Sequence, residues 1–444
     1  MTKKLQQNQW AKAESASWLL SPAKKIEPFI FYLLILFLPT QFGKHFWFDF
    51  SYVVGGRIDY LSPTLYLTDV FIVILFVLSF LQKKIRVHPL FSLATLFISV
   101  SIFSSGSPMA GWYYLVKFLE LSFLVWYVAN KNINKTIMGL LVMVGIVFES
   151  VLSVLQIFHQ GSLGGIVYLL GERAFSSSTP GIANASVSGE LILRPYGTFS
   201  HPNMLAGYFI VAMLLVMYFL KRKGKAMLAL SVLSLIFGTV GLALTLGRAA
   251  IVAWLLIGCI TIAITYKERI AKNVLLLSLS VGTVLLLVAV FFPPVVARLF
   301  SFSLGESLSE RASLAKSALS MILSHPLFGV GPNNFISSLP TFSKNSFVLQ
   351  PVHNIYLLIT AELGISGLIL FCGFLWSIIK RFYMAWRKSL IGERNRLLPL
   401  GLALFAILFL GFFDHYFLTL QQGQLLFALV MGTIMREAKG KFTK

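Results

Sequence analysis

Long apolar segments recur along the chain, and short polar segments separate them. We expect twelve helices, near residues 26–40, 66–81, 88–104, 112–130, 134–158, 202–220, 226–245, 249–266, 273–292, 353–379, 397–413 and 418–435. Most of these segments approach the length of about 20 residues that a helix needs to cross a bilayer. Because a membrane-spanning segment must satisfy its own backbone hydrogen bonds, the pattern predicts an all-α, polytopic bundle of membrane helices.

The composition supports the same fold class. The chain has 444 residues, of which 57% are hydrophobic and 12% are charged, which is too little charge to cover a soluble domain of this size. We expect one integral membrane domain over residues 1–444, with a large outer loop at residues 293–352. The first apolar segment follows a basic polar stretch and has no small-residue cleavage site after it, so we expect it to be retained as the first helix.

The basic residues alternate between the two sides of the predicted bundle. The net charge of +21 would suggest nucleic acid in a soluble protein. Here 27 of the 37 Lys and Arg residues fall in one set of loops and nine fall in the other. Since cytoplasmic loops are enriched in Lys and Arg, both termini are predicted to be cytoplasmic, and no nucleic-acid partner is expected.

Four residues stand out on the opposite, outer side: Arg194, Arg248, Arg311 and His353. An arginine fork matches phosphate oxygens, helix N-termini attract anions, and a neutral histidine can accept a proton from a hydroxyl. Together they suit glycosyl transfer from a polyprenyl diphosphate to an alcohol. Taken singly, an outer arginine more often contacts lipid headgroups, and a histidine at a helix boundary is more often a cap.

An amphipathic helix is predicted within the outer loop. Ser307 and Glu310 have the spacing of a capping box, and the helix should end before Pro326. The apolar stripe is expected to contain Leu308, Ala312, Ala315, Leu319 and Ile322.

Other polar residues of the predicted spans have simpler interpretations. Lys117 and Glu120 lie three positions apart and should neutralise each other, although a proton relay is an alternative. Asp414 and His415 fall in the last outer turn. They could serve the site, but an ordinary exposed turn is the expectation. The sequence has no metal-ligand spacing and no nucleotide-binding loop, so neither a metal nor a cofactor is expected.

Several short motifs together resemble a known family. Residues 324–335 read Ser-His-Pro-Leu-Phe-Gly-Val-Gly-Pro-Asn-Asn-Phe, and Pro-Val-His-Asn-Ile-Tyr and Glu-Leu-Gly follow at 351–356 and 362–364. Upstream lie Gly-Thr-Phe-Ser-His-Pro-Asn at 197–203 and the turn at Arg248. Over residues 194–367 the chain resembles the O-antigen ligase and O-antigen polymerase superfamily of bacterial membrane glycosyltransferases.

The resemblance implies a metal-independent enzyme with a fold of the GT-C type. Its donor would be a glycan linked to undecaprenyl diphosphate. By motif, Arg248 and Arg311 would bind the diphosphate and His353 would be the catalytic base, while Arg194 is added from the placement of charge. The segment Leu246-Gly247-Arg248 departs from the expected pattern, in which Ser precedes Arg.

The resemblance leaves the acceptor open. A ligase would use lipopolysaccharide core, a polymerase a growing glycan, and a third type of enzyme a protein side chain. The expected location is the bacterial cytoplasmic membrane, with membrane lipids around the bundle and the active site on its outer face in the cell envelope. A multi-span transporter or flippase of lipid-linked glycans is one alternative function, and a scaffold of a glycan-assembly complex is another.

Overall fold

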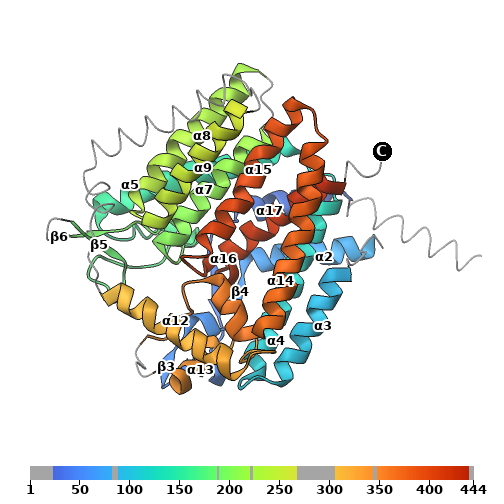
Figure 1. Cartoon of the computed structure of the whole chain (residues 1–444). Coiled ribbons are helices and arrows are strands. Elements are labelled where there is room, and N and C mark those ends of the chain that lie inside the picture. The colour runs from blue at the N-terminus through green and yellow to red at the C-terminus, as the bar shows by residue number, and fades with distance from the viewer. Residues whose placement is uncertain are drawn as a thin grey trace, which may run out of the picture.

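The computed structural model describes residues 24–82, 89–187, 190–220, 224–267, 306–343 and 348–439. These residues form a bundle of helices with a few short strands in the connecting segments (Figure 1). Residues 24–36 are helical. The later helices are α2 (Leu67–Leu81), α3 (Pro89–Phe103), α4 (Pro108–Asn130), α5 (Lys135–His159), α6 (Ile166–Leu169), α7 (Pro202–Phe219), α8 (Lys225–Leu244), α9 (Arg248–Lys267), α12 (Glu306–Ser324), α13 (Phe335–Phe342), α14 (Ile355–Arg387), α15 (Ile391–Leu410), α16 (Tyr416–Thr419) and α17 (Gln421–Lys439).

The expected all-α class is confirmed, and eleven of the twelve expected helices have a counterpart at the same place in the chain. The remaining one, at residues 273–292, lies outside the described residues. By length and composition, four of the described helices (α5, α7, α8 and α14) are long and apolar enough to cross a membrane. The number of crossings therefore stays a prediction.

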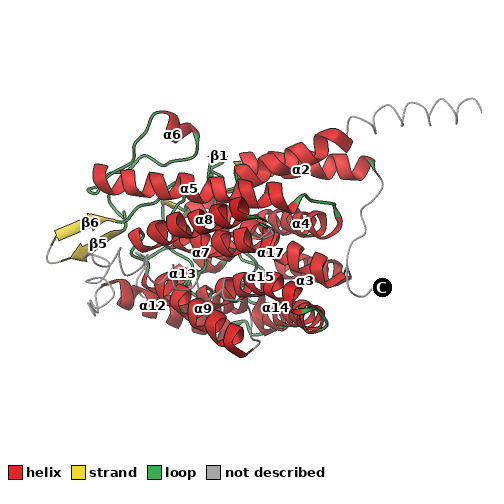
Figure 2. Ribbon diagram, turned by 90° about the horizontal axis from the view of Figure 1, so that it is seen from above, coloured by secondary structure: helices red, strands yellow, loops and turns green. Residues whose placement is uncertain are grey.

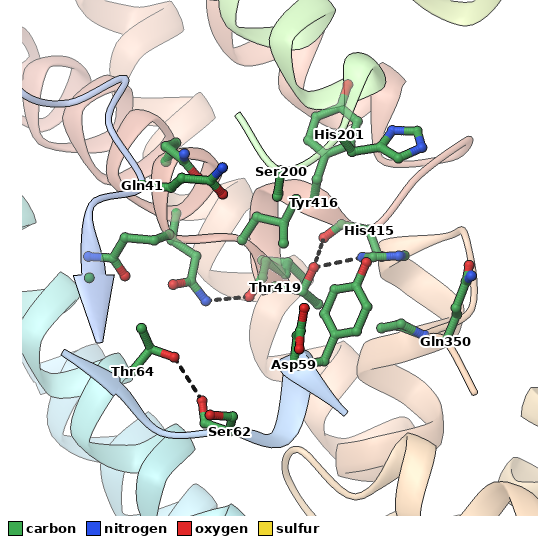
Figure 3. Close-up of a pocket in the computed structure, with 18 of the residues that line it drawn as sticks. Gln41, Asp59, Ser62, Thr64, Ser200, His201, Gln350, His415, Tyr416 and Thr419 are labelled. Atoms are coloured by element: carbon green, nitrogen blue, oxygen red, sulfur yellow. Dashed lines mark hydrogen bonds between the residues drawn. The ribbon is translucent and has the colours of Figure 1, made fainter. Parts of the chain in front are cut away.

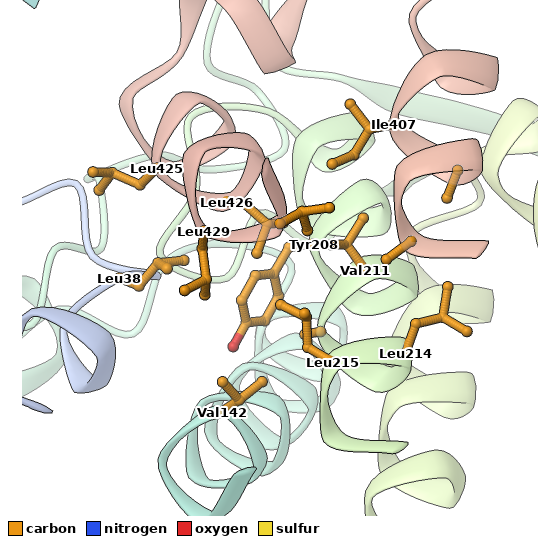
Figure 4. Close-up of a cluster of buried hydrophobic side chains, with 14 of the residues drawn as sticks. Leu38, Val142, Tyr208, Val211, Leu214, Leu215, Ile407, Leu425, Leu426 and Leu429 are labelled. Carbon is orange, nitrogen blue, oxygen red and sulfur yellow. The ribbon is translucent and has the colours of Figure 1, made fainter. Parts of the chain in front are cut away.

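Helix α7 lies at the centre of the larger hydrophobic core. It packs against α5, α8 and α15, and Figure 4 shows Tyr208 and Leu215 of α7 among Val142 of α5 and Ile407 of α15. Helix α8 approaches closely because a Cβ added to its Gly238 would lie 2.5 Å from the sulfur of Met213. Small residues at such contacts allow membrane helices to pack tightly.

The strands form three separate antiparallel pairs in the connecting segments. β1 (Gly43–His45) pairs with β4 (Thr64–Tyr66), β2 (Tyr52–Val53) with β3 (Gly56–Arg57), and β5 (Asn184–Val187) with β6 (Glu190–Leu193). Figure 2 shows the β5–β6 hairpin at one side of the helices, beyond the end of α5. These pairs hold the long connections in place without forming a larger sheet among the described residues.

Helix α14 is broken in its first third, at Gly364, and the segment between α12 and α13 fills the break. Gly364 has φ 69° and ψ −178°, which interrupts the helical hydrogen bonding. The amides of Val330 and Gly331 donate to the carbonyls of Ala361 and Glu362, at 2.9 and 3.0 Å. The loop thus satisfies backbone groups that the break leaves free, as buried carbonyls require.

The same break fixes α13. A Cβ on Gly329 (φ 69°) would lie 2.3 Å from the carbonyl carbon of Glu362, so only glycine fits there. The buried carboxylate of Glu362 accepts the amide of Phe335, the first residue of α13, at 3.2 Å. Helices α12 and α13 are therefore anchored to α14.

The amphipathic helix exists as α12 and ends before Pro326, as expected, but its buried face differs from the predicted stripe. Leu308, Ala312 and Leu319 are exposed, so their assignment to the apolar face was wrong. The buried residues are Leu314, Ser317, Ala318 and Met321. The face is rotated because α12 packs against α13 and α14, with Leu314 and Met321 in one cluster with Phe335.

Candidate functional site

A cavity of about 590 Å³ lies at the end of the bundle where α13 packs. Its wall combines the segment around β1 and β4, the loop before α7, the start of α14, the turn between α15 and α16, and the start of α17. Figure 3 shows polar side chains from these separate segments lining it, among them Gln41, Asp59, His201, Gln350 and His415. Such a concave site with convergent polar groups is the usual form of a ligand pocket.

His353 lies two residues before the start of α14 and lines this cavity. The next residue, Asn354, caps the helix by accepting the amide of Leu357 at 3.0 Å. The amide of Ile355 donates to the carbonyl of Gly411 at 2.8 Å, which joins the start of α14 to the end of α15. The imidazole is therefore held at the positive end of a helix.

The carboxylate of Asp414 is the hydrogen-bond partner of His353. His353 Nδ1 lies 3.2 Å from Asp414 Oδ1, which also accepts the backbone amide of His415 at 2.9 Å. Asn203 Nδ2 donates to the other oxygen at 2.9 Å. Burial alone would raise the pKa of Asp414, but the His353 hydrogen bond and the neighbouring histidines hold it below its ordinary value.

The expectation that Asp414 and His415 form an exposed turn is wrong. Their exposed fractions are 7% and 3%, because the turn packs beneath Tyr60, whose ring meets the imidazole of His415 edge-on with centroids 5.4 Å apart. His415 Nδ1 pairs with Thr419 Oγ1 at 2.6 Å. Burial lowers the pKa of His415 to about 4, so it stays uncharged near neutral pH.

A third histidine, His201, is the N-cap of α7. Its Nδ1 accepts the backbone amide of Asn203 at 3.1 Å. Burial and the nearby Arg194 guanidinium lower the pKa of His201 to about 3. Both His201 and His415 line the cavity, but the imidazole of His353 is more exposed than that of His415, with side-chain exposures of 19% and 3%.

Arg194 lies inside the protein, and only 7% of it is exposed. Its Nε donates to the carbonyl of Thr245 at 2.8 Å, and its Nη2 donates to Asn203 Oδ1 at 2.6 Å. Because Asn203 in turn donates to Asp414, the guanidinium connects the turn before Arg248 with the partner of His353. This geometry suits a positioning residue better than a diphosphate ligand.

The other two predicted arginines are described by the structure but are not among the residues that line the cavity. Arg311 of α12 donates from Nη1 to the carbonyl of Phe413 at 3.0 Å, one residue from Asp414. Arg248 is the exposed first residue of α9. The structure thus brings Arg311 and His353 into contact with one turn, at residues 413–414. Arg194 reaches this turn through Asn203 and also contacts the carbonyl of Thr245, three residues before Arg248.

Two polar side chains of α5 bind the backbone of the loop that precedes α7. Glu149 accepts the amide of Thr198 at 3.0 Å, and Gln156 Oε1 accepts the amide of Gly197 at 2.8 Å. These buried side chains fix the turn that leads into His201. Their place in an apolar helix was visible in the sequence, but the loop they hold was not.

The ion pair expected for Lys117 is confirmed and is larger than expected. Its ammonium lies 3.2 Å from Glu120 and 2.7 Å from Asp69 of α2. It also donates to the amide oxygen of Gln421 at 3.1 Å. Lys117 lines the cavity at the side where α4 and α17 meet.

Among the described residues, one group has ligand atoms arranged so that they could hold a metal ion. These atoms belong to His353, Asp414 and His415 and lie within 4.8 Å of one another. The hydrogen bonds to Asp414 and Thr419 already use the Nδ1 atom of each imidazole. Metal independence stays a prediction.

Part of the chain matches a protein-family model. Residues 233–372 match the model of the O-antigen ligase family, and this stretch contains Arg248, Arg311 and His353. The match supports membership of the O-antigen ligase superfamily, so the resemblance found in the sequence is confirmed. It indicates a membrane protein with a glycosyltransferase-like role in polysaccharide assembly. No curated protein matches the chain.

Proposed function

We propose that this member of the O-antigen ligase superfamily transfers a glycan from undecaprenyl diphosphate to an acceptor hydroxyl during cell-surface polysaccharide assembly. The observation that supports the proposal most directly is the hydrogen bond of 3.2 Å between His353 Nδ1 and the buried carboxylate of Asp414, at the wall of a large cavity. A histidine oriented by a carboxylate is a common arrangement for removing a proton from a hydroxyl.

The carboxylate determines which nitrogen of His353 does the chemistry. An ionised carboxylate can only accept hydrogen bonds, so the proton of a neutral imidazole resides on Nδ1, beside Asp414. Nε2 is then free to take the proton of the acceptor hydroxyl as its oxygen attacks the anomeric carbon of the donor. The bond from that carbon to the diphosphate oxygen breaks, and undecaprenyl diphosphate leaves with the electron pair.

The arginines would stabilise the charge on the departing diphosphate. Arg311 is favoured for this because Phe413 holds its guanidinium next to the turn that carries Asp414. Arg248 adds a second, exposed guanidinium at the start of α9, where the helix N-terminus also favours an anion. Arg194 would hold Asn203 and Asp414 in place for His353.

The remaining parts of the proposal concern placement. The chain would be a GT-C-like bundle with twelve spans in the bacterial cytoplasmic membrane, with cytoplasmic termini and the cavity on the outer face. The excess of Lys and Arg on the other set of loops supports this orientation. The reaction would need no metal, and lipid A core, a growing glycan and a protein side chain are all candidate acceptors.

The test uses purified protein in detergent with an undecaprenyl-diphosphate-linked glycan and a panel of acceptors. We expect H353A to lower the rate of transfer by about 10²–10⁴, the usual contribution of a general base. H325A is the matched control, because His325 is an exposed histidine at the end of α12, and we expect it to behave as the parent. Transfer at the parental rate by H353A would refute the mechanism.

A second outcome separates the enzyme from a transporter. A flippase of lipid-linked glycans would move the donor across proteoliposomes without cleaving it. If the parent protein releases no undecaprenyl diphosphate with any acceptor, the proposed reaction is wrong, whatever the variants do.

A further inference from the structure

The connection between α5 and α7 carries an exposed apolar segment at residues 161–171, which we call the α6 loop. Figure 2 shows α6 projecting from the side of the bundle beside α5. Ile166 and Leu169 are 77% and 64% exposed, and Leu163 and Tyr168 are exposed as well. The loop contains no Asp, Glu, Lys, Arg or His. A continuous exposed apolar surface of this kind indicates a contact with lipid or with another protein.

The backbone of the α6 loop is held in place by a buried carboxylate. The two oxygens of Glu172 accept the amides of Leu163 at 2.9 Å and Gly164 at 2.8 Å. Gln156 of α5 donates to the same carboxylate at 2.8 Å. Gly164 and Gly165 have φ of 69° and 58°, a conformation that glycine adopts readily. The exposed side chains are therefore presented by a backbone that is fixed to α5.

Both ends of the α6 loop lie at the ends of helices. Gly161 follows the last residue of α5, His159, by two positions. At the other end of the loop, Thr40 donates from Oγ1 to the carbonyl of Leu170 at 2.6 Å, and Thr40 lies shortly after the helix at residues 24–36. Helix α5 is long and apolar enough to cross a membrane. The ends of such a helix lie where the hydrocarbon meets the headgroups, which places the α6 loop at that level.

The α6 loop also follows an exposed apolar stripe on α5. Val144, Val151, Leu155 and Phe158 are exposed, and at 3.6 residues per turn they fall within about 60° of the helix circumference. The stripe is about 21 Å long, and the buried residues of α5 lie on the opposite side. A stripe of this length on a spanning helix suits contact with hydrocarbon. The α6 loop begins three residues after Phe158 and extends the apolar surface to the helix end.

We infer that the α6 loop inserts its apolar side chains into the bilayer interface and anchors the wall of the cavity to the membrane surface. Tyr168, Gly171 and Glu172 line the cavity, so the loop joins the cavity to the bilayer. Interfacial segments bury their apolar side about 5–10 Å into the boundary between headgroups and acyl chains, and Tyr is enriched at that level. The lack of charge favours lipid over a protein partner, whose contact would have a polar rim.

The first test measures the depth of the loop by spin labelling. Cys259 and Cys372 are both exposed, so the labels are introduced in a C259A/C372A background. The full chain is placed in vesicles of phosphatidylethanolamine and phosphatidylglycerol. Each label is then tested for collisions with oxygen, which concentrates in hydrocarbon, and with a polar nickel complex, which stays in water.

The expected result is an order among four labelled variants. The ratio of oxygen to nickel accessibility should be severalfold higher at I166C and L169C than at S178C, the matched control, which is an exposed position on the same connection. V151C, on the stripe of α5, should give the highest ratio because it lies deeper in the hydrocarbon. The two loop positions should fall between V151C and S178C.

A second test uses the unaltered protein, so that it does not depend on the folding of any variant. Two phospholipids are compared in the same vesicles, one with a photoreactive diazirine near its headgroup and one with the diazirine at the end of an acyl chain. The first should label residues 161–171 more strongly than the second. The second should label the stripe of α5, and neither should label residues 176–181.

The outcomes separate lipid from the other occupants of this surface. If I166C and L169C match S178C with both reagents, the α6 loop lies in water and the inference is wrong. If both labels are shielded from oxygen and from nickel, and neither phospholipid labels the loop, a second copy of the chain or another protein covers it, and the inference is also wrong. Neither test requires glycan transfer, so failure of the proposed function would leave these results unchanged.

Discussion

Replacing Asp414 by asparagine probes the partner of the proposed base with almost no change in size. The carboxylate accepts three hydrogen bonds, from His353 Nδ1 at 3.2 Å, the His415 amide at 2.9 Å and Asn203 Nδ2 at 2.9 Å. An asparagine has one acceptor oxygen and one NH₂ group. In D414N at least one of these contacts must therefore place a donor against a donor.

The surrounding groups limit how the asparagine can be accommodated. Asn203 cannot simply turn its amide over, because its oxygen accepts Arg194 Nη2 at 2.6 Å. With the new NH₂ group toward His353, the imidazole must move its proton to Nε2, which can then no longer accept one. With the NH₂ toward Asn203, a buried donor is left without a partner, which costs about 1–3 kcal/mol.

We expect D414N to lower kcat by about 100-fold or more, since a misplaced tautomer removes most of the contribution of a general base. The KM for the donor should change little, because the proposed diphosphate ligands are the arginines. D59N is the matched control, an acid in the same cavity wall whose loss should leave kcat near the parental value. Steady-state release of undecaprenyl diphosphate measures both constants. A kcat for D414N within about threefold of the parent would show that Asp414 does not orient the base.

Three further predictions concern metal, pH and packing. Glycan transfer should persist in the presence of EDTA, and elemental analysis of the purified protein should detect no tightly bound metal. A loss of activity that zinc or magnesium restores would contradict the metal-independent mechanism. The pKa of His201 is about 3 in the folded protein and about 6.5 in the unfolded chain. As the pH falls below 6.5, the unfolded state binds the proton first, so the free energy of unfolding decreases. At pH 5 this amounts to about 2 kcal/mol, and H201N, which keeps a capping acceptor, should show a smaller fall in Tm between pH 7 and pH 5. G329A should lower Tm by several degrees, because the added Cβ would lie 2.3 Å from the carbonyl carbon of Glu362. The control is G258A, whose added Cβ would have no atom within 4 Å, and its Tm should match that of the parent in the same scan.

The helices could be predicted from the sequence because apolar periodicity records which segments need a nonpolar environment. The break at Gly364 could not, because the residues around it continue the apolar pattern and the backbone partners come from Val330 and Gly331, more than 30 positions earlier. The rotation of α12 escaped prediction for a similar reason. The helix carries Leu308 and Leu319 on one side and Leu314 and Met321 on another, and contact with α13 and α14 buries the second pair.

The site was predicted in part. His353 and Arg311 were singled out from charge and motif, because an arginine on the predicted outer side contradicts the usual distribution of basic residues. Asp414 was noticed in a turn but taken as exposed, since nothing local to its sequence shows that Tyr60 and His353 cover it. Asn203 stood within a motif, and its role became visible only where the loop before α7 meets the turn before α16.

The broken helix gives the family motif a geometric explanation. Arg311 lies on α12 and His353 just before α14, so the distance between the proposed diphosphate ligand and the proposed base depends on how these helices are joined. Gly329 and Gly364 join them, since each lets one backbone approach the other where a Cβ would collide at 2.2–2.3 Å. A displacement of about 1 Å between reacting groups can cost about 100-fold in rate. Substitutions at this junction should therefore lower kcat even in molecules that remain folded, although neither glycine lines the cavity.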